Sequence, residues 1–289
     1  MNDQTFILHQ AVADRNALIG AVLVESGQLS TQQRDQVILE QQSTGLRFGE
    51  AAQALGLLDS VAVDRALARQ FGYPVMPVGA GSLATQLSMA YEPFSRQSEA
   101  VRSIRSQLML RWFNESRKTL TIAGVSGGEG VSLFVANLAI AFSQLGRNVL
   151  LVDANLRQPS QRRIFGIQER PGLADMLAGR SAHAAITRIA PFPGLSLLQA
   201  GTLPPNPQEL FARDAHDLLQ RTVVRAYDIV LFDAPAFSVC VDALSLAERS
   251  QGVLLVLRRD RTAVCEAQAA AQLISESGAR MIGTVLVDS

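Results

Sequence analysis

Short apolar runs alternate with amphipathic stretches through the second half of the chain. The runs are apolar along their whole length, and helical spacing of apolar residues lies between most of them. Continuous apolar strands separated by helices are typical of a parallel sheet covered on both faces. We therefore predict an α/β domain with a doubly wound, mostly parallel sheet over residues 98–289. The predicted strands are TLTIAGV (119–125), NVLLVDA (148–154), LSLLQA (195–200), DIVLFDA (228–234), GVLLVLR (252–258) and MIGTVLV (281–287).

The first part of the chain has helical spacing and an internal repeat. Residues 18–42 and 47–70 align at one constant offset, so that Gly20 pairs with Gly49. Each copy holds an apolar helix, a glycine that can end it, and a second helix. Such self-similarity indicates two copies of one small helical unit. We predict a small, mainly helical domain at residues 1–75.

The stretch that follows loses this periodicity. Prolines and glycines interrupt it at Pro74, Pro77, Gly79 and Gly81, which is typical of loops and extended arms. We predict a linker at residues 76–97.

Composition narrows the functional classes. Lys+Arg and Asp+Glu both number 26, and this balance argues against duplex nucleic acid as a partner, which favours a basic face. Cys240 and Cys265 form no CxxC pattern and are expected to be free thiols. The three histidines, His9, His183 and His216, lack the spacing of metal ligands. No apolar run approaches roughly 18 residues and no secretory signal is present, so a cytoplasmic protein without a transmembrane segment is expected.

The turn after the first predicted strand is rich in glycine. It reads GVSGGEGVSLF, and residues 125–132, the glycine-rich loop, lie between a strand and a helix. Gly127, Gly128 and Gly130 permit backbone conformations that turn amide hydrogens inward. The positive end of the following helix favours an anion, and Ser132 has the position of a magnesium ligand. This context predicts a phosphate-binding loop.

Two further turns at the same edge of the predicted sheet carry acidic residues. Asp153 ends the second predicted strand, and Asp233 ends the fourth. Ligands of doubly wound sheets lie beyond the carboxyl ends of the strands, so we expect both carboxylates at a magnesium ion beside the glycine-rich loop. Arg157, in the turn after Asp153, is placed to face a phosphate. For each aspartate taken alone, a helix cap or a turn residue is the alternative.

Several longer motifs resemble one family. They are GGEGVS, LLVDANLRQP, IVLFDAP, PGLADMLAG and AGTLPPNPQELF, and the similar region covers about two thirds of the chain, from about Glu99 onward. This region resembles the bacterial tyrosine kinases of polysaccharide export, a branch of the MinD-like P-loop ATPases. The resemblance implies a P-loop NTPase-like fold that binds ATP or ADP with magnesium. It assigns Gly127, Gly128, Glu129, Gly130, Val131, Ser132 and Arg157 to the nucleotide, Ser132, Asp153 and Asp233 to magnesium, and catalysis to Asp153 and Asp233.

The family also implies partners. EAVRSIR matches its Glu-x-x-Arg-x-x-Arg segment, which packs between subunits of a ring in relatives, so Glu99, Arg102 and Arg105 are expected in a homo-oligomer contact. The resemblance further implies a polysaccharide co-polymerase of the inner membrane as partner, a role in chain-length determination during exopolysaccharide synthesis, and a peripheral position at that membrane.

The repeat module resembles the small N-terminal domain of type II secretion and pilus-assembly ATPases. Some relatives of that domain bind cyclic di-GMP through two copies of an Arg-Leu-Gly, Gly, Gln pattern. The second copy here keeps Arg47 and Gly49, whereas the first has Leu18 in place of the arginine. This pattern is compatible with two alternatives, a protein-docking module and a cyclic di-GMP site.

The chain departs from the family pattern at the predicted site. Val131 replaces the Walker A lysine, Ser126 replaces the extra signature lysine of MinD-like ATPases, and Asn155 replaces an aspartate. No tyrosine cluster follows the last predicted strand. We expect a catalytically impaired kinase, a pseudokinase that acts as a regulatory scaffold. One alternative is an active ATP-dependent tyrosine kinase or ATPase in which Arg157 or a neighbour's arginine replaces the lysine. The other, a MinD-like positioning ATPase, is disfavoured because no amphipathic targeting helix ends the sequence.

Overall fold

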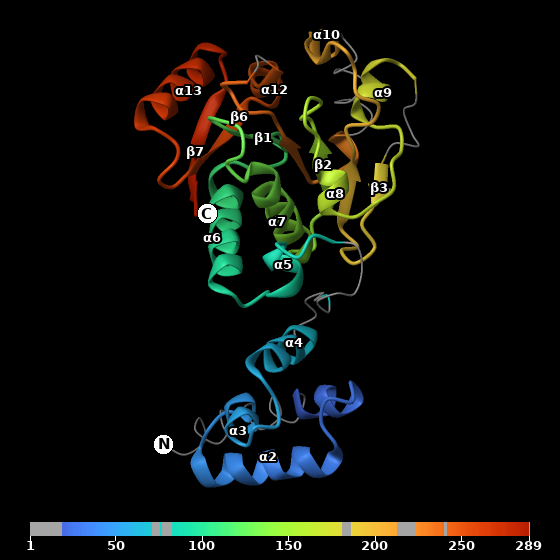
Figure 1. Ribbon diagram of the computed structural model, residues 1–289, viewed down its shortest axis with the longest axis vertical. Coiled ribbons are helices and arrows are strands. Elements are labelled where there is room, and N and C mark those ends of the chain that lie inside the picture. The colour runs from blue at the N-terminus through green and yellow to red at the C-terminus, as the bar shows by residue number, and fades with distance from the viewer. Residues whose placement is uncertain are drawn as a thin grey trace. The chain divides into compact units, whose positions relative to one another are not determined.

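The chain contains two compact units in its described part. One lies within Met1–Met76 and Ala90–Ser95, and the other within Pro77–Met89 and Arg96–Ser289. The smaller unit is helical and the larger unit holds the sheet (Figure 1). The computed structural model describes residues 19–70, 76, 83–180, 186–212, 224–239 and 242–288.

The smaller unit is built from short helices. A helical segment over 19–25 precedes three further helices. Ser30 begins the first of these with a reciprocal cap: its hydroxyl accepts from the Gln33 N–H at 3.1 Å, and Gln33 Oε1 accepts from the Ser30 N–H at 2.8 Å. Buried apolar side chains, among them Leu23, Val37 and Phe48, form its core. The helices are α2 (Thr31–Thr44), α3 (Phe48–Ala54) and α4 (Ser60–Gln70).

The repeated glycines have a packing role. A Cβ on Gly49 would lie 2.5 Å from Val63 Cγ1, and a Cβ on Gly20 would lie 3.3 Å from the Phe48 ring. The repeat pattern therefore coincides with positions where a methyl group would clash, at Gly49, or fit only tightly, at Gly20. Arg47, the other residue of the predicted dinucleotide pattern, is exposed immediately before α3.

The larger unit contains one seven-stranded sheet in the order β3-β4-β2-β5-β1-β6-β7. All neighbouring strands are parallel except the pair β3 and β4. The α/β, mostly parallel architecture is confirmed, and each of the six predicted strands is present. The three-residue antiparallel strand β3 was not predicted. The strands are β1 (Thr119–Gly124), β2 (Val149–Asp153), β3 (Ile186–Arg188), β4 (Leu195–Leu198), β5 (Ile229–Asp233), β6 (Gly252–Arg258) and β7 (Arg280–Val287).

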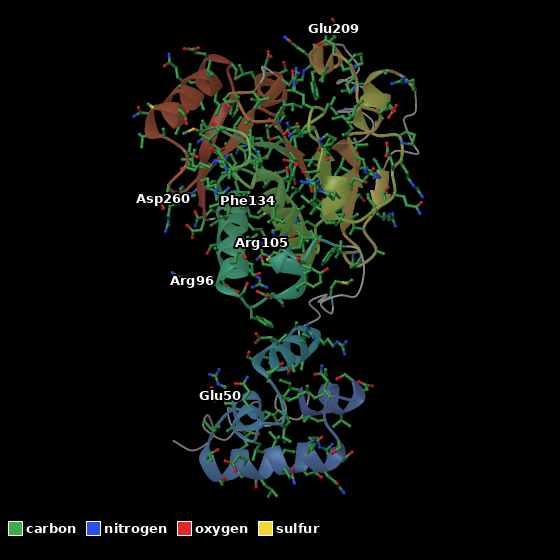
Figure 2. All side chains as sticks on the ribbon, in the orientation of Figure 1. Glu50, Arg96, Arg105, Phe134, Glu209 and Asp260 are labelled. Carbon is green, nitrogen blue, oxygen red and sulfur yellow. The ribbon has the colours of Figure 1, made fainter. Side chains whose placement is uncertain are left out.

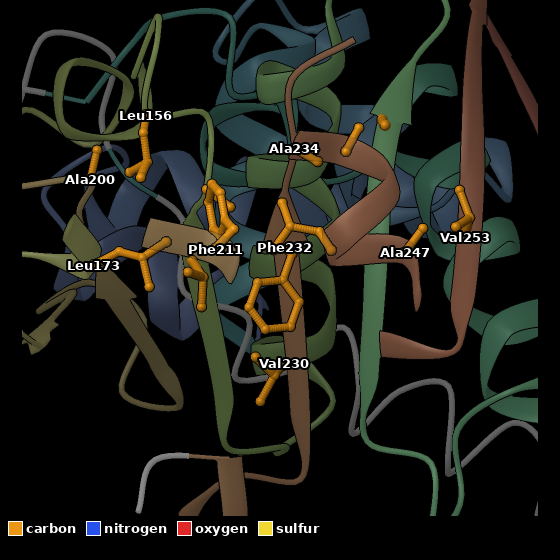
Figure 3. Packing of buried hydrophobic residues seen from close by; sticks show 14 of the residues in the cluster. Leu156, Leu173, Ala200, Phe211, Val230, Phe232, Ala234, Ala247 and Val253 are labelled. Atoms are coloured by element: carbon orange, nitrogen blue, oxygen red, sulfur yellow. The ribbon is translucent and has the colours of Figure 1, made fainter. Parts of the chain in front are cut away.

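Helices cover both faces of the sheet (Figure 1). On one face α6 packs beside α7, and α7 contacts β1, β2, β4 and β5. On the other face, side chains such as Val230 and Phe232 of β5 pack with Phe211 and Ala247 (Figure 3). The strands at the centre are buried on both sides, which explains their continuous apolar sequence. The helices and the short 3₁₀ turn of this unit are α6 (Arg96–Arg111), α7 (Val131–Gln144), α8 (Gln161–Ile164), α9 (Leu173–Leu177), α10 (Pro207–Ala212), η1 (Val224–Ala226), α12 (Asp242–Ser250) and α13 (Val264–Glu276).

Part of the predicted linker packs on the larger unit. Leu87 and Met89 are fully buried. The Met89 N–H donates to Asn137 Oδ1 at 3.0 Å, and Gln144 Nε2 donates to the Met89 carbonyl at 3.1 Å. Both partners lie on α7, the helix that follows the glycine-rich loop. The segment includes the start of α5 (Ser88–Tyr91), and the domain limits stay predictions. None of the described helices has the length and apolar character needed to cross a membrane.

Candidate functional site

The predicted site residues gather at the carboxyl ends of three adjacent strands. Asp153 of β2 is paired in register with Asp233 of β5, and Asp233 is in turn paired with Ile122 of β1. Both aspartates are fully buried. Because the glycine-rich loop continues from β1, the sheet brings this loop and both carboxylates to one edge, as the sequence predicts.

The glycine-rich loop has the backbone of an anion-binding turn. Gly128 and Gly130 have φ angles of 79° and 78°, in the left-handed region that favours glycine. Gly127, Gly128 and Gly130 are exposed. Gly130 is also the N-cap of α7, a helix of 14 residues, so its free N–H groups and its positive dipole end open at the loop. Val131 is the first residue of this helix and brings a half-buried apolar side chain to the lysine position.

The Glu129 side chain is turned into the protein. Its exposed fraction is 1%. Oε2 accepts from the N–H of Val125 at 2.7 Å and of Ser126 at 3.1 Å, and Oε1 accepts from the Thr262 hydroxyl. The buried Glu129 carboxylate thus holds the loop by hydrogen bonds to its backbone and to Thr262. Any contact of this residue with a nucleotide would come from its backbone.

The two buried aspartates are held by one short segment. Asp153 Oδ2 accepts from the N–H of Ser160 at 3.0 Å and of Gln161 at 2.9 Å. Gln161 Nε2 donates to Asp233 Oδ2 at 2.7 Å, and the Ser132 side chain also hydrogen-bonds to Asp233. Gln161 therefore joins both carboxylates, and Ser132 connects them to the loop.

Burial shifts the protonation of this pair. Burial, together with the charge of Asp233, raises the pKa of Asp153 to about 8, against the lowering effect of backbone N–H groups. Burial raises the pKa of Asp233 to about 6, opposed by its hydrogen bonds from Gln161 and Ser132. Two buried carboxylates side by side thus retain protons unless a cation neutralises them.

The residues present fit a magnesium ion. Within the described residues, Asp153 Oδ1, Asp233 Oδ1 and Gln161 Oε1 are buried without a hydrogen-bond partner. The same described residues bring together no group of three or more His, Cys, Asp or Glu side chains that could hold a metal. Magnesium is commonly held by one or two carboxylates, completed by waters and substrate phosphates, and Asp153, Asp233 and Ser132 match that pattern.

Arg157 forms an ion pair with a buried aspartate. Its Nε donates to Asp242 Oδ2 at 2.9 Å, and the Asp242 side chain is only 2% exposed. Asp242 is the first residue of α12, so this ion pair ties the turn after β2 to that helix. Asn155 stands where the family pattern has an aspartate. Its Oδ1 accepts from the Gln158 N–H at 3.1 Å and so forms part of the same turn.

The predicted oligomer motif lies on α6. Glu99 and Arg102 form an ion pair in which the Glu99 side chain is 63% exposed and the Arg102 side chain only 12%. Arg105 Nη1 donates to the Ala141 carbonyl of α7 at 3.0 Å, and Figure 2 labels this arginine beside α7. Arg105 therefore has a contact inside its own unit.

Two groups of contacts at the site were missed by sequence reasoning. Gln161 carries no motif that distinguishes it from any other glutamine. The turn after β6 contributes Arg258, Arg261 and Thr262, whose side chains all bond to the glycine-rich loop. That turn also follows the carboxyl end of a parallel strand, and the basic run RRDR was a usable signal.

Two of the longer motifs contact each other beside this edge. The Ala174 N–H donates to the Ala200 carbonyl at 2.9 Å, and the Thr202 N–H donates to Asp175 Oδ2 at 3.0 Å. These hydrogen bonds hold the two motif segments, PGLADMLAG and AGTLPPNPQELF, against each other.

Comparison with known proteins agrees with this geometry. The family model described as cellulose biosynthesis protein BcsQ matches residues 117–277. The tyrosine-protein kinase YwqD of Bacillus subtilis is 31% identical over 195 residues, covering 68% of this chain and 82% of the relative. The kinase domain of the Escherichia coli tyrosine kinase ETK has a TM-score of 0.67 at 27% identity, covering 72% of this chain and 82% of that chain.

A more distant structure shares the fold. The septum site-determining protein MinD from Pyrococcus horikoshii, solved in complex with Mg-ADP, has a TM-score of 0.50 at 24% identity over 58% of this chain and 69% of that chain. The chain therefore belongs to the BcsQ/MinD-like family of P-loop proteins, in which its named relatives are bacterial tyrosine-protein kinases.

Proposed function

We propose that this protein binds a nucleoside triphosphate with magnesium but turns it over poorly, and that it acts as a regulatory partner in exopolysaccharide synthesis. The proposal is carried by one observation: the same site lacks the lysine of the family pattern and keeps the residues suited to magnesium. Val131 begins α7 where the family pattern has lysine, while Ser132, Asp153 and Asp233 keep the arrangement of a magnesium site.

The missing lysine removes a charge from binding and from catalysis. A lost charge-assisted hydrogen bond weakens binding by about 1.5–3 kcal/mol. The loss of a group that stabilises charge in the transition state typically lowers a rate by about 10² to 10³. Asn155 is a second loss, because an amide accepts a hydrogen bond but neither adds negative charge nor acts as a base.

The remaining groups support binding. Loop N–H groups and the start of α7 suit the phosphates. Asp153, Asp233 and Ser132 would hold magnesium, which when bound would neutralise phosphate charge. Burial of the two carboxylates makes them dependent on the ion for charge balance.

The pathway and the partners follow from the family. Relatives named for cellulose biosynthesis and tyrosine kinase activity support a role in polysaccharide production. We propose a co-polymerase of the inner membrane as the partner, chain-length control as the process, self-association through the face of α6, and a peripheral cytoplasmic position. Glu99, Arg102 and Arg105 are the residues proposed for the self-contact, with Glu99 the more exposed member of its ion pair.

The smaller unit is proposed to dock a protein. Leu39, Leu55 and Val61 expose 65%, 41% and 44% of their surface, and exposed apolar groups on so small a unit favour a protein partner. The packing role of Gly49 accounts for part of the repeat without a ligand, so cyclic di-GMP remains the less supported occupant.

The test is nucleotide binding and turnover by the purified full chain. We expect calorimetry to detect weak Mg-ATP binding and phosphate-release assays to detect little or no turnover, with affinity and turnover both increased by Val131→Lys. Turnover in the unmodified protein that Asp233→Ala abolishes would instead support an active kinase or ATPase with an altered loop. Absence of binding would overturn the proposal.

A further inference from the structure

Two arginines of the turn between β6 and α13 bond to the backbone of the glycine-rich loop. Arg258 Nη1 donates to the Gly128 carbonyl at 3.0 Å. Arg261 Nη1 donates to the same carbonyl at 3.1 Å, and its Nη2 donates to the Gly127 carbonyl at 3.3 Å. Both guanidinium groups thus lie on the carbonyl side of the loop.

The same turn also holds the loop through a buried carboxylate. The Thr262 hydroxyl donates to Glu129 Oε1, and Glu129 Oε2 accepts from the N–H groups of Val125 and Ser126. Glu129 is only 1% exposed, so water does not compete for these bonds. With the arginine contacts included, each residue from 125 to 129 has a bond to the turn or to this carboxylate.

We propose that Arg258, Arg261 and Thr262 are positioning residues, which keep the glycine-rich loop in its phosphate-binding conformation before a nucleotide arrives. They act through the backbone of the loop and not on the phosphates. This inference rests on the proposed function, since it concerns the same ligand. It explains how a loop with Val131 in place of the lysine retains affinity.

The first argument is that these contacts leave the donors of the loop free. In a trans peptide the C=O and the following N–H point in opposite directions, so the N–H groups of Gly128 and Glu129 point away from the arginines. Within the part of the chain that the structure describes, the N–H groups of residues 127–132 donate to no protein acceptor. The turn therefore occupies the carbonyls of the loop and leaves its N–H groups available to an anion.

The second argument is the composition of the loop. Three of the five residues 126–130 are glycine, and glycine loses more backbone freedom on ordering than any other residue. A loop that orders only when the phosphate arrives binds more weakly by that cost, whereas a loop held beforehand does not. Hydrogen bonds from guanidinium groups are stronger than neutral ones, so they are suited to hold such a loop.

The third argument is that the turn is itself anchored. The Thr262 hydroxyl accepts from the Arg258 N–H at 2.9 Å, and the Thr262 N–H donates to the Arg258 carbonyl at 3.0 Å. The Arg259 N–H donates to the Val287 carbonyl of β7 at 2.9 Å. These bonds close the turn and tie it to a strand of the sheet, so the side chains that hold the loop extend from a fixed backbone.

The test is the dissociation constants of Mg-ATP and Mg-ADP for the full chain, measured by calorimetry. We expect Arg261→Ala to raise both constants by the same factor, about tenfold, because both nucleotides use the same loop N–H groups. Arg259→Ala is the control in the same turn, since the Arg259 side chain pairs with Asp288 at 3.1 Å on the surface. It should leave both constants unchanged.

Thr262 offers a matched pair of variants. Thr262→Val removes the hydroxyl but keeps a β-branched side chain of similar size, so Glu129 Oε1 loses its donor and both dissociation constants should rise. Thr262→Ser keeps the hydroxyl and should bind both nucleotides nearly as the unmodified chain does.

Hydrogen exchange separates positioning from a general loss of stability. In the nucleotide-free chain, Arg261→Ala and Thr262→Val should speed the exchange of the Val125 and Ser126 N–H groups, which Glu129 protects, and should leave the exchange of β5 unchanged. Saturating Mg-ATP should remove most of the difference, because the bound ligand then orders the loop.

The outcomes distinguish the two proposals. If the unmodified chain binds Mg-ATP and Arg261→Ala behaves like Arg259→Ala, the positioning role is overturned while the proposed function stands. A rise confined to Mg-ATP would indicate direct contact with the terminal phosphate and would overturn the positioning role as well. If the unmodified chain binds no nucleotide, both proposals are overturned.

Discussion

Gln161 Nε2 lies 2.7 Å from Asp233 Oδ2 and 2.9 Å from the Ser132 carbonyl. One amide thus joins the end of β5 to the start of α7, while the backbone N–H of the same residue holds Asp153. Gln161 has no exposed surface. The two predicted magnesium ligands and the glycine-rich loop are therefore connected through a residue that no motif marks.

The first prediction concerns this amide. Gln161→Ala should lower the free energy of unfolding by about 1–3 kcal/mol, because buried acceptors on Asp233 and Ser132 lose their donor. It should also weaken Mg-ATP binding. Urea denaturation followed by fluorescence measures the first effect and calorimetry the second. Gln158→Ala, at an exposed position nearby, is the control, and equal stability of the two variants would contradict the bridging role.

The second prediction is a pH dependence of stability. The pKa values of Asp153 and Asp233 are raised to about 8 and about 6, above the value of about 3.9 in an unfolded chain. The protonated pair therefore stabilises the fold fully below about pH 4, and this contribution is lost as the pH rises through about 6 and about 8. Asp153→Asn should flatten the fall in melting temperature over that range.

Magnesium should reverse this trend. Because the ion binds the ionised carboxylates, Mg-ATP should raise the melting temperature more at pH 8 than at pH 6. Scanning fluorimetry of the unmodified chain and of Asp153→Asn measures the difference. A shift that is equal at both pH values would place the ion away from this pair.

Much of the fold was readable because local pattern and tertiary environment agree. The central strands are buried on both faces, so their sequence is apolar throughout, and each of them was predicted. The glycine-rich loop was readable because left-handed backbone at Gly128 and Gly130 requires glycine. These features are local in sequence.

The parts that escaped prediction depend on contacts between distant segments. Arg261 reaches Gly127 across 134 positions of the chain, and no local pattern records such a pairing. The packing of part of the predicted linker could not be foreseen for a related reason. Its prolines and glycines indicate an extended chain, whereas the burial of Leu87 and Met89 is decided by the surface of α7.

The third prediction concerns that segment. Met89→Ala should lower the free energy of unfolding of the larger unit by about 2–5 kcal/mol, as expected for a fully buried side chain. Asn137→Ala should add a further loss by leaving the Met89 N–H without its acceptor. Hydrogen exchange of α7 measures both. Gln86→Ala, at an exposed position in the same segment, should leave the exchange of α7 unchanged.

The fourth prediction separates packing from ligand binding in the smaller unit. Gly49→Ala would place a methyl group 2.5 Å from Val63 Cγ1, so it should destabilise the unit by about 1–3 kcal/mol through overpacking. Val63→Ala alone creates a cavity. Combined with Gly49→Ala, it provides the room that the new methyl group needs. The double variant should therefore be more stable than the sum of the two single losses predicts. Hydrogen exchange over residues 48–63 of the full chain reads out the coupling. If the two losses simply add and Gly49→Ala changes only an affinity for cyclic di-GMP, Gly49 serves a ligand and the packing explanation is wrong.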